Sequence, residues 1–342
     1  MDTERPAQEK ITWYRSPVTR QQLQALNERS DFKGSLQTGG FLALLTLTGS
    51  AALFSVGRFA WPLVVLLFFV HGTCWRFLLH RFHELLHKTV FKKKLANHFF
   101  AYLFGFLGWM HPHQFWASHT EHHKYTLHAP DDLEVVLPVS LRLDKFLLRY
   151  FVDPVGLAIV FYSNLMMACG KPLRPWHKTL FAHADPAERR RWVIWSRFLL
   201  VGHGTIVIVS VIMHWWFLPV VTTFAPFYAG WLCFICNNLQ HAGLQDNVGD
   251  FRLCCRTVTL NPFLTFLYWH MNYHTEHHMY AAVPCYNLAK LHRLIKSDLP
   301  PCPNGLFEAW TQLALILKRQ KIDPSYQYVP NLPAPSRPSN VI

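Results

Sequence analysis

The same five residues, His-Thr-Glu-His-His, occur twice in this chain, at 119–123 and again at 274–278. If each copy is helical, its first, fourth and fifth residues share one face, so we expect each copy to direct three imidazoles toward one point. Imidazoles are ligands for zinc, copper, iron and nickel, whereas magnesium and calcium prefer oxygen ligands. One such motif is unremarkable in a chain with 21 histidines, but two identical copies favour a metal site.

A third cluster has the sequence His83-Glu84-Leu85-Leu86-His87, which places its two histidines one helical turn apart. It also matches the HExxH motif of zinc proteases, in which the glutamate acts as general base. A catalytic zinc takes three protein ligands and a water, so this interpretation leaves both repeated motifs without a role. We therefore keep a membrane zinc protease only as a distant alternative. Asn237 and His241 are likewise one turn apart.

The composition predicts a membrane protein with a sizeable polar part, because 51% of the residues are hydrophobic and 15% are aromatic. Each pair of apolar runs is joined by almost nothing, which favours two helical hairpins and four transmembrane helices. The shorter apolar stretch 99–109 cannot span a bilayer and is expected to be a buried or re-entrant helix. The four runs are 41–57, 59–74, 198–217 and 218–236.

The charges predict the orientation of these spans. Arg58 is the one charge between the first two runs, while the segment between the hairpins carries the basic runs 92–94 and 189–191. By the positive-inside rule, this middle segment and both termini belong in the cytoplasm. The net charge of +13 then reflects topology and contact with anionic headgroups, and we expect no nucleic-acid partner.

We accordingly predict an all-α integral membrane protein whose histidine motifs gather in a cytoplasmic helical cap. Residues 1–35 form a polar cytoplasmic N-terminal segment, 36–322 the membrane domain and 323–342 a proline-rich tail. The eight cysteines lie in apolar runs or on the cytoplasmic side, which disfavours disulfides. Cys233 and Cys236, and the adjacent Cys254 and Cys255, are interpreted as structural.

Two further kinds of metal protein compete. A metal transporter needs ligands within the spans, near the midplane, and His203 and His214 are the candidates there. A dinuclear oxygen-activating centre, for which iron is the natural metal, instead uses all the histidine motifs. Helices that leave the membrane would deliver them to one cytoplasmic site, where a membrane-borne cap gives access to acyl chains.

With these motifs in this order, the chain resembles the membrane fatty acid desaturases, a superfamily of histidine-box, non-haem di-iron enzymes that includes lipid hydroxylases and carotenoid ketolases. The resemblance covers roughly residues 40–300 and depends on HxxxH at 83–87 and HxxHH at 119–123 and 274–278. It implies nine histidine ligands for two irons, without assigning any ligand to one iron or the other. The implied metal-binding residues are His83, His87, His119, His122, His123, His241, His274, His277, His278 and, through a water, Asn237.

The resemblance also implies the reaction, which is O2-dependent desaturation of a fatty acyl chain or a related lipid at a cytoplasmic di-iron site. A lipid hydroxylase or ketolase of the same superfamily is the alternative. No His-Pro-Gly-Gly haem motif occurs, so a fused cytochrome b5 domain is not expected. Electrons would come from a separate donor of ferredoxin or cytochrome b5 type, with its reductase.

Residues around the boxes supply further candidates. Acidic residues that could orient a ligand through its free ring N–H are Glu84, Glu121, Asp131, Asp132 and Glu276. Extra histidines that we expect not to be ligands are His80, His111, His113 and His128. Aromatic candidates for the lining of an apolar substrate channel are Trp109, Phe115, Trp116, Tyr268 and Trp269.

Overall fold

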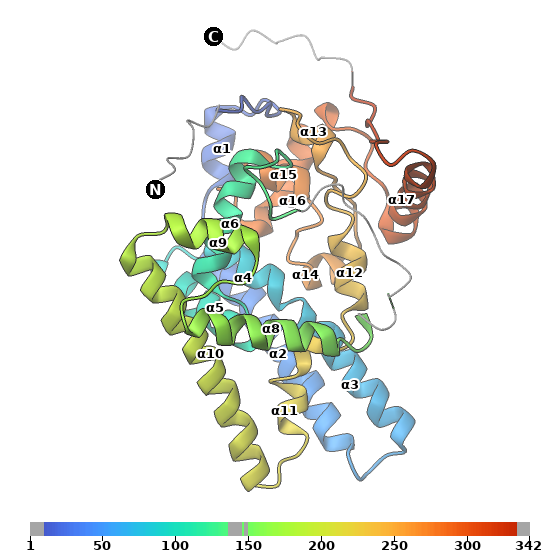
Figure 1. The fold of residues 1–342 in the computed structure, drawn as a ribbon. Helices are drawn as coiled ribbons and strands as arrows, with labels where there is room; N and C mark the ends of the chain where they lie inside the picture. The colour runs from blue at the N-terminus through green and yellow to red at the C-terminus, as the bar shows by residue number, and fades with distance from the viewer. Residues whose placement is uncertain (1–9, 136–145, 147–149, 334–342) are drawn as a thin grey trace.

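The computed structural model describes residues 10–135, 146 and 150–333, and the regular elements within them are helices, accompanied by four isolated β-bridges. The predicted all-α class is confirmed for these residues. Figure 1 shows long helices that protrude from one side of a helical head. The head consists of α1 (Arg20–Leu26), α4 (Leu78–Leu86), α5 (Lys94–Leu107), α6 (Pro112–Tyr125), α9 (Pro175–His183), α12 (Trp231–Asn237), α13 (Phe251–Cys254), α14 (Pro262–Leu267), α15 (His274–Met279), α16 (Cys285–Ile295), η3 (Lys296–Asp298) and α17 (Gly305–Ile322).

The first protruding hairpin is formed by α2 (Asp31–Ser55) and α3 (Trp61–Arg76). The Ser30 hydroxyl accepts a hydrogen bond from the Lys33 backbone N–H at 3.3 Å and so caps the start of α2. The turn between the helices includes Gly57 at φ 73°, a backbone conformation that favours glycine. Since α3 runs almost directly into α4, both arms are long and apolar enough to cross a membrane.

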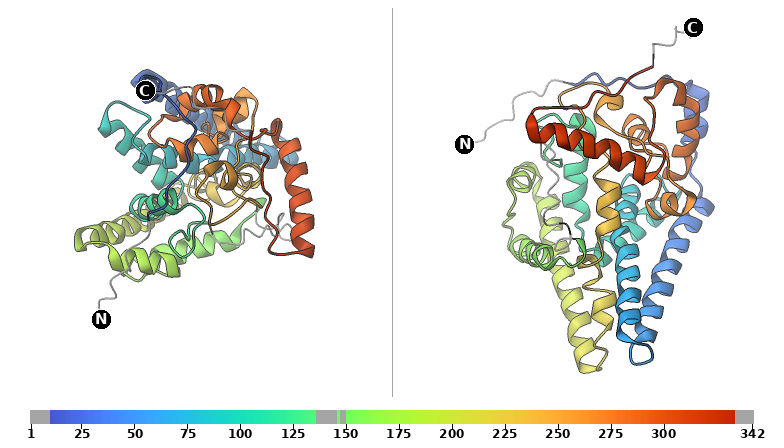
Figure 2. Two further views of the ribbon diagram at one scale, coloured as in Figure 1. Left: turned by 90° about the horizontal axis from the view of Figure 1, so that it is seen from above. Right: turned by 90° about the vertical axis from the view of Figure 1, so that its right-hand side faces the viewer.

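The second hairpin has one continuous arm and one broken arm (Figure 2). Its continuous arm is α10 (Pro186–Ile212), which is also long and apolar enough to cross a membrane. The returning run 218–236 does not form one continuous helix. It is divided into α11 (Leu218–Val221), η2 (Ala225–Phe227) and α12, and prolines at 219 and 226 remove backbone donors that a continuous helix would use.

Two shorter apolar helices lie where the protruding helices meet the head. The predicted short helix over 99–109 is present as α5, which packs against α4. The other is α8 (Pro154–Ala168), which packs against α10 and crosses the molecule at the base of the hairpins in Figure 1. Neither is long enough to span a bilayer.

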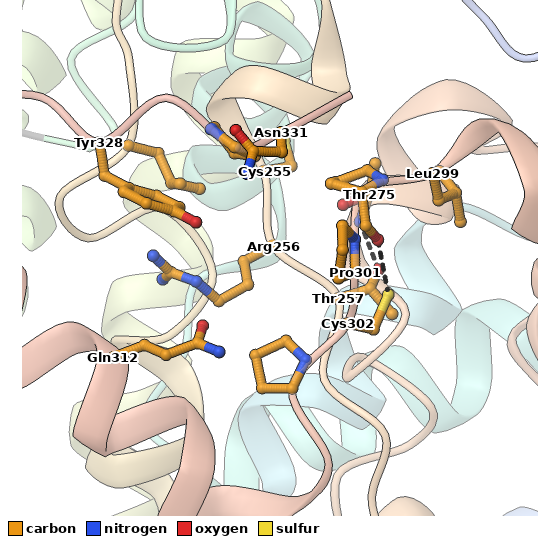
Figure 3. Close-up of a pocket in the computed structure, with 14 residues that line it drawn as sticks. Cys255, Arg256, Thr257, Thr275, Leu299, Pro301, Cys302, Gln312, Tyr328 and Asn331 are labelled. Atoms are coloured by element: carbon orange, nitrogen blue, oxygen red, sulfur yellow. Dashed lines mark hydrogen bonds between the residues drawn. The ribbon is translucent and has the colours of Figure 1, made fainter. Parts of the chain in front are cut away.

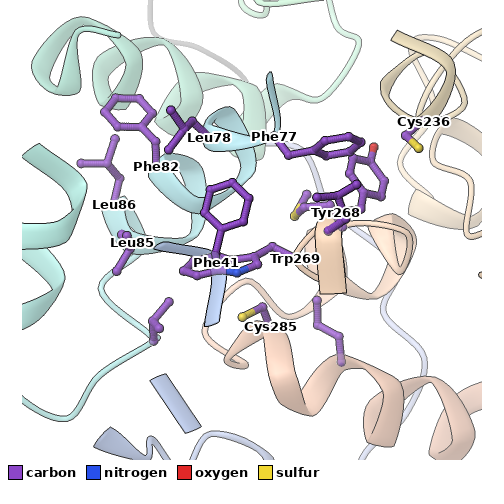
Figure 4. Close-up of a cluster of buried hydrophobic side chains, with 14 of the residues drawn as sticks. Phe41, Phe77, Leu78, Phe82, Leu85, Leu86, Cys236, Tyr268, Trp269 and Cys285 are labelled. Carbon is purple, nitrogen blue, oxygen red and sulfur yellow. The ribbon is translucent and has the colours of Figure 1, made fainter. Parts of the chain in front are cut away.

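A buried aromatic core holds α4 against the segment that precedes α15 (Figure 4). The side chains of Phe41, Phe77 and Trp269 are 0% exposed. Among them lies the buried guanidinium of Arg81, which donates hydrogen bonds to the carbonyls of Phe77 and Leu267 at 2.6 and 2.5 Å. Because α4 carries the histidine motif at 83–87 and α15 the one at 274–278, this core fixes two motifs relative to each other.

The structure adds detail at the boundaries expected for the three parts of the chain. α2 begins at Asp31, so the boundary predicted at residue 35 falls inside a helix. At the other end α17 stops at Ile322, next to the start of the predicted tail. The described part of that tail contacts the head, where the Tyr328 N–H donates a hydrogen bond to the Gly243 carbonyl at 2.8 Å. The division into three parts stays a prediction.

Candidate metal centre

Nine histidines meet inside the head and form two groups. In each group the ring nitrogens available for an ion lie within 4.8 Å of one another. The members are the nine histidines predicted from the sequence. The first group consists of His83, His87, His119, His123 and His277. The second group consists of His122, His241, His274 and His278.

Each repeated motif divides its histidines between the two groups. His119 and His123 enter the first group, but His122 enters the second. In the other copy, His274 and His278 enter the second group, whereas His277 enters the first. The expectation that each motif aims three imidazoles at one point is therefore wrong. Adjacent residues on a helix diverge by about 100°, so the fourth and fifth positions of each motif reach different partners across the helix interface.

The ring nitrogens converge as ligands of a common ion do. His83 Nε2 lies 2.7 Å from His119 Nε2, and His274 Nε2 lies 2.9 Å from His241 Nε2 and 3.1 Å from His278 Nε2. Two nitrogens bound at about 2.1 Å to one ion, at a right angle, are roughly 3 Å apart. The buried nitrogens of the first group without a hydrogen-bond partner include His87 Nε2, His123 Nε2 and His277 Nε2. Each group therefore fits a metal ion.

Burial holds most of these imidazoles in the neutral form, which is the form that binds metals. It lowers the pKa of His87 and of His241 to about 3 each. His122 differs. Burial also opposes its charged form, but the charge and hydrogen bond of Asp132 outweigh that effect and raise the pKa of His122.

Two carboxylates orient histidines of the motif at 119–123, one for each group. His119 Nδ1 donates to Glu134 Oε1 at 2.9 Å, and His122 Nδ1 donates to Asp132 Oδ2 at 2.8 Å. These hydrogen bonds turn the Nε2 atoms toward the two groups. Asp132 was a candidate partner from sequence, whereas Glu134 was missed. The signal that would have found it is the continuation of the acidic run at 131–134.

Glu84, the glutamate of the HExxH motif, connects α4 to α15. Its Oε1 lies 3.1 Å from His83 Nδ1 and 3.4 Å from His277 Nδ1, and the residue is only 1% exposed. It therefore lies behind two imidazoles of the first group, where it can orient them. A protease base would instead face a water on the open side of a single zinc.

The two glutamates inside the repeated motifs lie in different surroundings. Glu121 forms a surface ion pair with Lys124 at 2.8 Å. Glu276 is buried and accepts a hydrogen bond from His292 Nδ1 at 2.5 Å, which ties α15 to α16. Glu276 thus helps to fix the position of α15, the helix that carries the motif.

His241 is placed by its loop rather than by a helix. It lies in the turn after α12, and its Nδ1 donates to the Cys254 carbonyl at 2.8 Å. The Arg256 guanidinium donates to the carbonyls of Leu239 and Ala242 at 2.7 and 3.1 Å, on either side of His241 in sequence. Figure 3 shows Arg256 beside a small cavity of about 100 Å³. Burial lowers the pKa of Arg256 to about 10, so it stays charged at neutral pH. Sequence reasoning missed this residue.

The extra histidines near the boxes are outside both groups, as predicted. His80 Nε2 lies 3.1 Å from Asn237 Oδ1, so the structure pairs the asparagine with this ring. His111 Nε2 donates to the Trp192 carbonyl at 2.8 Å. A water-mediated role of Asn237 at a metal stays a prediction.

The two histidines that a transporter would use also lie outside both groups. His203 stacks between the rings of Trp109 and Phe106, at 4.0 and 4.5 Å. Its Nε2 lies 2.9 Å from the Phe106 carbonyl oxygen. His214 is exposed at the end of the second hairpin. These contacts indicate that His203 is a packing residue. Among the described residues, neither histidine group lies within the apolar runs 198–217 and 218–236.

All eight cysteines are free. Cys233, Cys236, Cys254 and Cys255 are buried, in keeping with a structural role. The adjacent pair has its Sγ atoms 3.9 Å apart.

A cavity of about 750 Å³ lies beside the first group. Two of the aromatic candidates for a substrate channel, Phe115 and Trp109, line it. The Phe115 ring also stacks on the His119 ring at a centroid distance of 5.0 Å. The aromatic candidates that lie elsewhere are Trp116, Tyr268 and Trp269.

Comparison with known families agrees with this geometry. A model of the fatty acid desaturase family matches residues 59–308, which is more than half of the chain and includes all nine histidines of the two groups. No curated protein matches the chain. The long apolar helices and the family together make this a membrane protein, and the histidine groups fit a metal site. The chain belongs to the fatty acid desaturase family.

Proposed function

We propose that this protein is an O2-dependent lipid desaturase that binds one iron in each histidine group. The observation that carries the proposal is the pair of adjacent, buried, all-imidazole groups in a head joined to long apolar helices. The family match supports oxidoreductase chemistry on a lipid.

The donor set supports iron over a single zinc. Nine imidazoles in two groups exceed the four ligands that one zinc takes, and the groups contain no thiolate or carboxylate. Imidazole is a good ligand for iron, and two bound irons would supply the activation of O2. The protein's own contribution is to orient the imidazoles through Glu84, Asp132 and Glu134.

The proposed reaction removes one hydrogen from each of two neighbouring carbons of an acyl chain. Two C–H bonds break and a carbon–carbon double bond forms. One O2, two electrons and two protons from outside, together with the two substrate hydrogens, give two waters. The chain must hold the substrate so that one C–H bond faces the metals, and Phe115 stands between the 750 Å³ cavity and His119.

For topology, we propose four crossings with the head in the cytoplasm. The basic run 189–191 begins α10 at its head end, and Arg58 lies at the far end of the first hairpin. This arrangement follows the positive-inside rule. The broken run 218–236 would be the fourth crossing, since it returns beside α10 toward the head in Figure 2. A separate ferredoxin or cytochrome b5 with its reductase would supply the electrons.

The proposal is tested by expressing the chain with a reductase system and analysing host lipids by mass spectrometry with double-bond localisation. We expect a new unsaturation and about two irons per purified chain. A gain of one oxygen would favour a hydroxylase or ketolase of the same superfamily. One tightly bound zinc, or cleavage of a membrane peptide without lipid change, would contradict the proposal.

The matched control separates a ligand from a neighbouring histidine. His241→Ala should abolish the new unsaturation, because it removes a member of the second group. His128→Ala should leave it in place, since that ring belongs to neither group. Equal activity of both variants would remove His241 from the proposed ligand set.

A further inference from the structure

The 750 Å³ cavity has one wall at the first histidine group. Phe115, which lines it, stacks on His119, and Glu134, which also lines it, accepts the hydrogen bond from His119 Nδ1 at 2.9 Å. Its volume lies within the range of about 300–1,000 Å³ that is usual for small-molecule sites. A molecule in the cavity is therefore separated from a predicted metal ligand by a single layer of side chains.

The opposite wall is α8. Ile159, Ser163, Asn164 and Met167 line the cavity from one face of this helix. Ile159 is also 41% exposed, so the cavity reaches the surface beside α8.

The outer side of α8 is an apolar surface. Val155, Phe161 and Tyr162 are each at least half exposed, and the helix carries no charged residue. The apolar surface continues on α10, where Phe198 is 52% and Val201 68% exposed. Contiguous exposed apolar surface of this kind marks a contact with a membrane or a protein. α8 crosses at the base of the protruding hairpins (Figures 1 and 2). We therefore expect a bilayer around α10 to cover the outer side of α8 as well.

Three cations surround the end of α8. Lys171 and Arg174 follow the helix, and Arg197 of α10 donates a hydrogen bond to the Ala168 carbonyl at 3.0 Å. All three are exposed, and Arg174 also lines the cavity. No acidic residue occurs in the segment 154–184. Exposed cations at the level of a membrane surface attract anionic lipid headgroups.

We propose that the substrate is a chain of an anionic membrane phospholipid, which enters the cavity sideways from the bilayer beside α8 while its headgroup stays on Lys171, Arg174 and Arg197. The proposal deepens the proposed function, on which it depends for the chemistry, by naming the lipid class. It assigns the acyl carrier to the membrane. A chain carried by a water-soluble thioester would instead approach from the aqueous side of the head.

The first test maps where a lipid chain lies in the unaltered protein. The full chain is placed in phosphatidylcholine nanodiscs that contain phosphatidylglycerol with a photoreactive group on one acyl chain. After irradiation, labelled peptides are identified by mass spectrometry. We expect labels on the cavity side of α8 and on the start of α6, at Ser163, Met167 or Phe115. Labels confined to the lipid-facing surfaces of α2, α3 and α10 would overturn the proposal.

A pair of variants on one helix then asks whether the cavity is needed. Ser163→Trp should remove most of the labelling of α6, because Ser163 lines the cavity and the larger side chain fills it. Phe161→Trp is the matched control, since this side chain is 51% exposed on the outer side of α8. Unchanged labelling of α6 in Ser163→Trp would contradict occupation of the cavity.

The headgroup is tested with the same probe. Replacing Arg174 by Gln should lower labelling of the cavity by about fivefold, the effect of one surface cation on an anionic lipid. Arg58→Gln, at the far end of the first hairpin, should leave it unchanged. Equal labelling by photoreactive phosphatidylcholine, or stronger cavity labelling by a photoreactive acyl-CoA, would overturn the lipid class. Labelling needs neither iron nor turnover, so its failure would leave the proposed desaturation standing, and absence of iron would not affect this test.

Discussion

The two histidine groups differ in what surrounds them. The first group is backed by two carboxylates, Glu84 and Glu134, and lies beside the large cavity. The second group is covered by the N-terminal segment, where the Trp13 ring stacks on Phe251 at 4.1 Å and Phe251 lies 5.5 Å from the ring of His278.

Their anchors differ as well. In the second group, one histidine is held by the carboxylate of Asp132 and another by the Cys254 carbonyl, in a loop fixed by Arg256. The first group draws all its members from α6, α15 and α4 with its C-terminal cap residue. The difference indicates that the groups are not equivalent, and it leads us to propose that the first group is the one that meets the substrate.

Removal of a ligand should have the largest effect. His277→Ala and His274→Ala alter neighbouring positions of α15, yet they should each empty a different group. We expect each variant to retain about one iron and to lose well over 100-fold in activity, more than loss of an outer hydrogen-bond partner costs. Mössbauer spectra of the remaining iron should differ between the variants. Identical spectra would show that the division into groups is wrong.

Loss of a carboxylate partner should be the next largest effect. Asp132→Asn should weaken iron binding in the second group and Glu134→Gln in the first, each by about 10- to 100-fold. Each variant keeps the size of the side chain but removes its charge. Titration with an iron chelator would measure both affinities. If the two variants weaken the same iron, the assignment of these carboxylates fails.

Disturbing the His241 loop should affect only the second group. Arg256→Gln leaves two buried carbonyls, those of Leu239 and Ala242, without their charged donor, which costs about 1–3 kcal/mol. We expect a lower melting temperature and a lower content of the second iron. Arg293→Gln, at an exposed position of α16, is the control. Loss of both irons in equal measure would contradict an effect limited to this loop.

The smallest effect concerns the start of α6, the helix that supplies both groups. Burial lowers the pKa of His111 to about 3 from its ordinary 6.5. Below pH 6.5 the unfolded chain therefore binds a proton that the folded chain does not, and stability falls by up to about 1.4 kcal/mol per pH unit. The contribution of the neutral His111 to stability is fully present above pH 6.5. His111→Asn should show about 1.4 kcal/mol less change in unfolding free energy between pH 7.5 and 5.5. An unchanged pH dependence would exclude His111 as its source.

The composition of the histidine groups could be predicted because the signal is local. Spacings of three and four residues identify the motifs, and the resemblance to the desaturases adds His241, which follows the fourth apolar run. How the members divide could not be predicted, since it depends on how α6 faces α15. His122 and His277 each enter a different group from the other two histidines of their motif, and this depends on the orientation in which α6 and α15 pack.

Residues that support the groups were harder to find. Glu134 follows its partner His119 by fifteen positions, outside any helical repeat, and Arg256 acts through carbonyls of a different segment. The broken form of 218–236 was equally hidden, because hydropathy does not register the missing N–H of a proline. Local spacing therefore identified the histidine motifs, the family resemblance implied the full set of ligands, and tertiary packing determined how its members divide.

The most direct test of the two-group account is a crystal structure of the iron-loaded protein, with anomalous scattering measured on both sides of the iron edge. We expect two iron peaks per chain. One should lie among His83, His87, His119, His123 and His277, and the other among His122, His241, His274 and His278. A single peak, or two peaks that each draw all three histidines of one repeated motif, would contradict it.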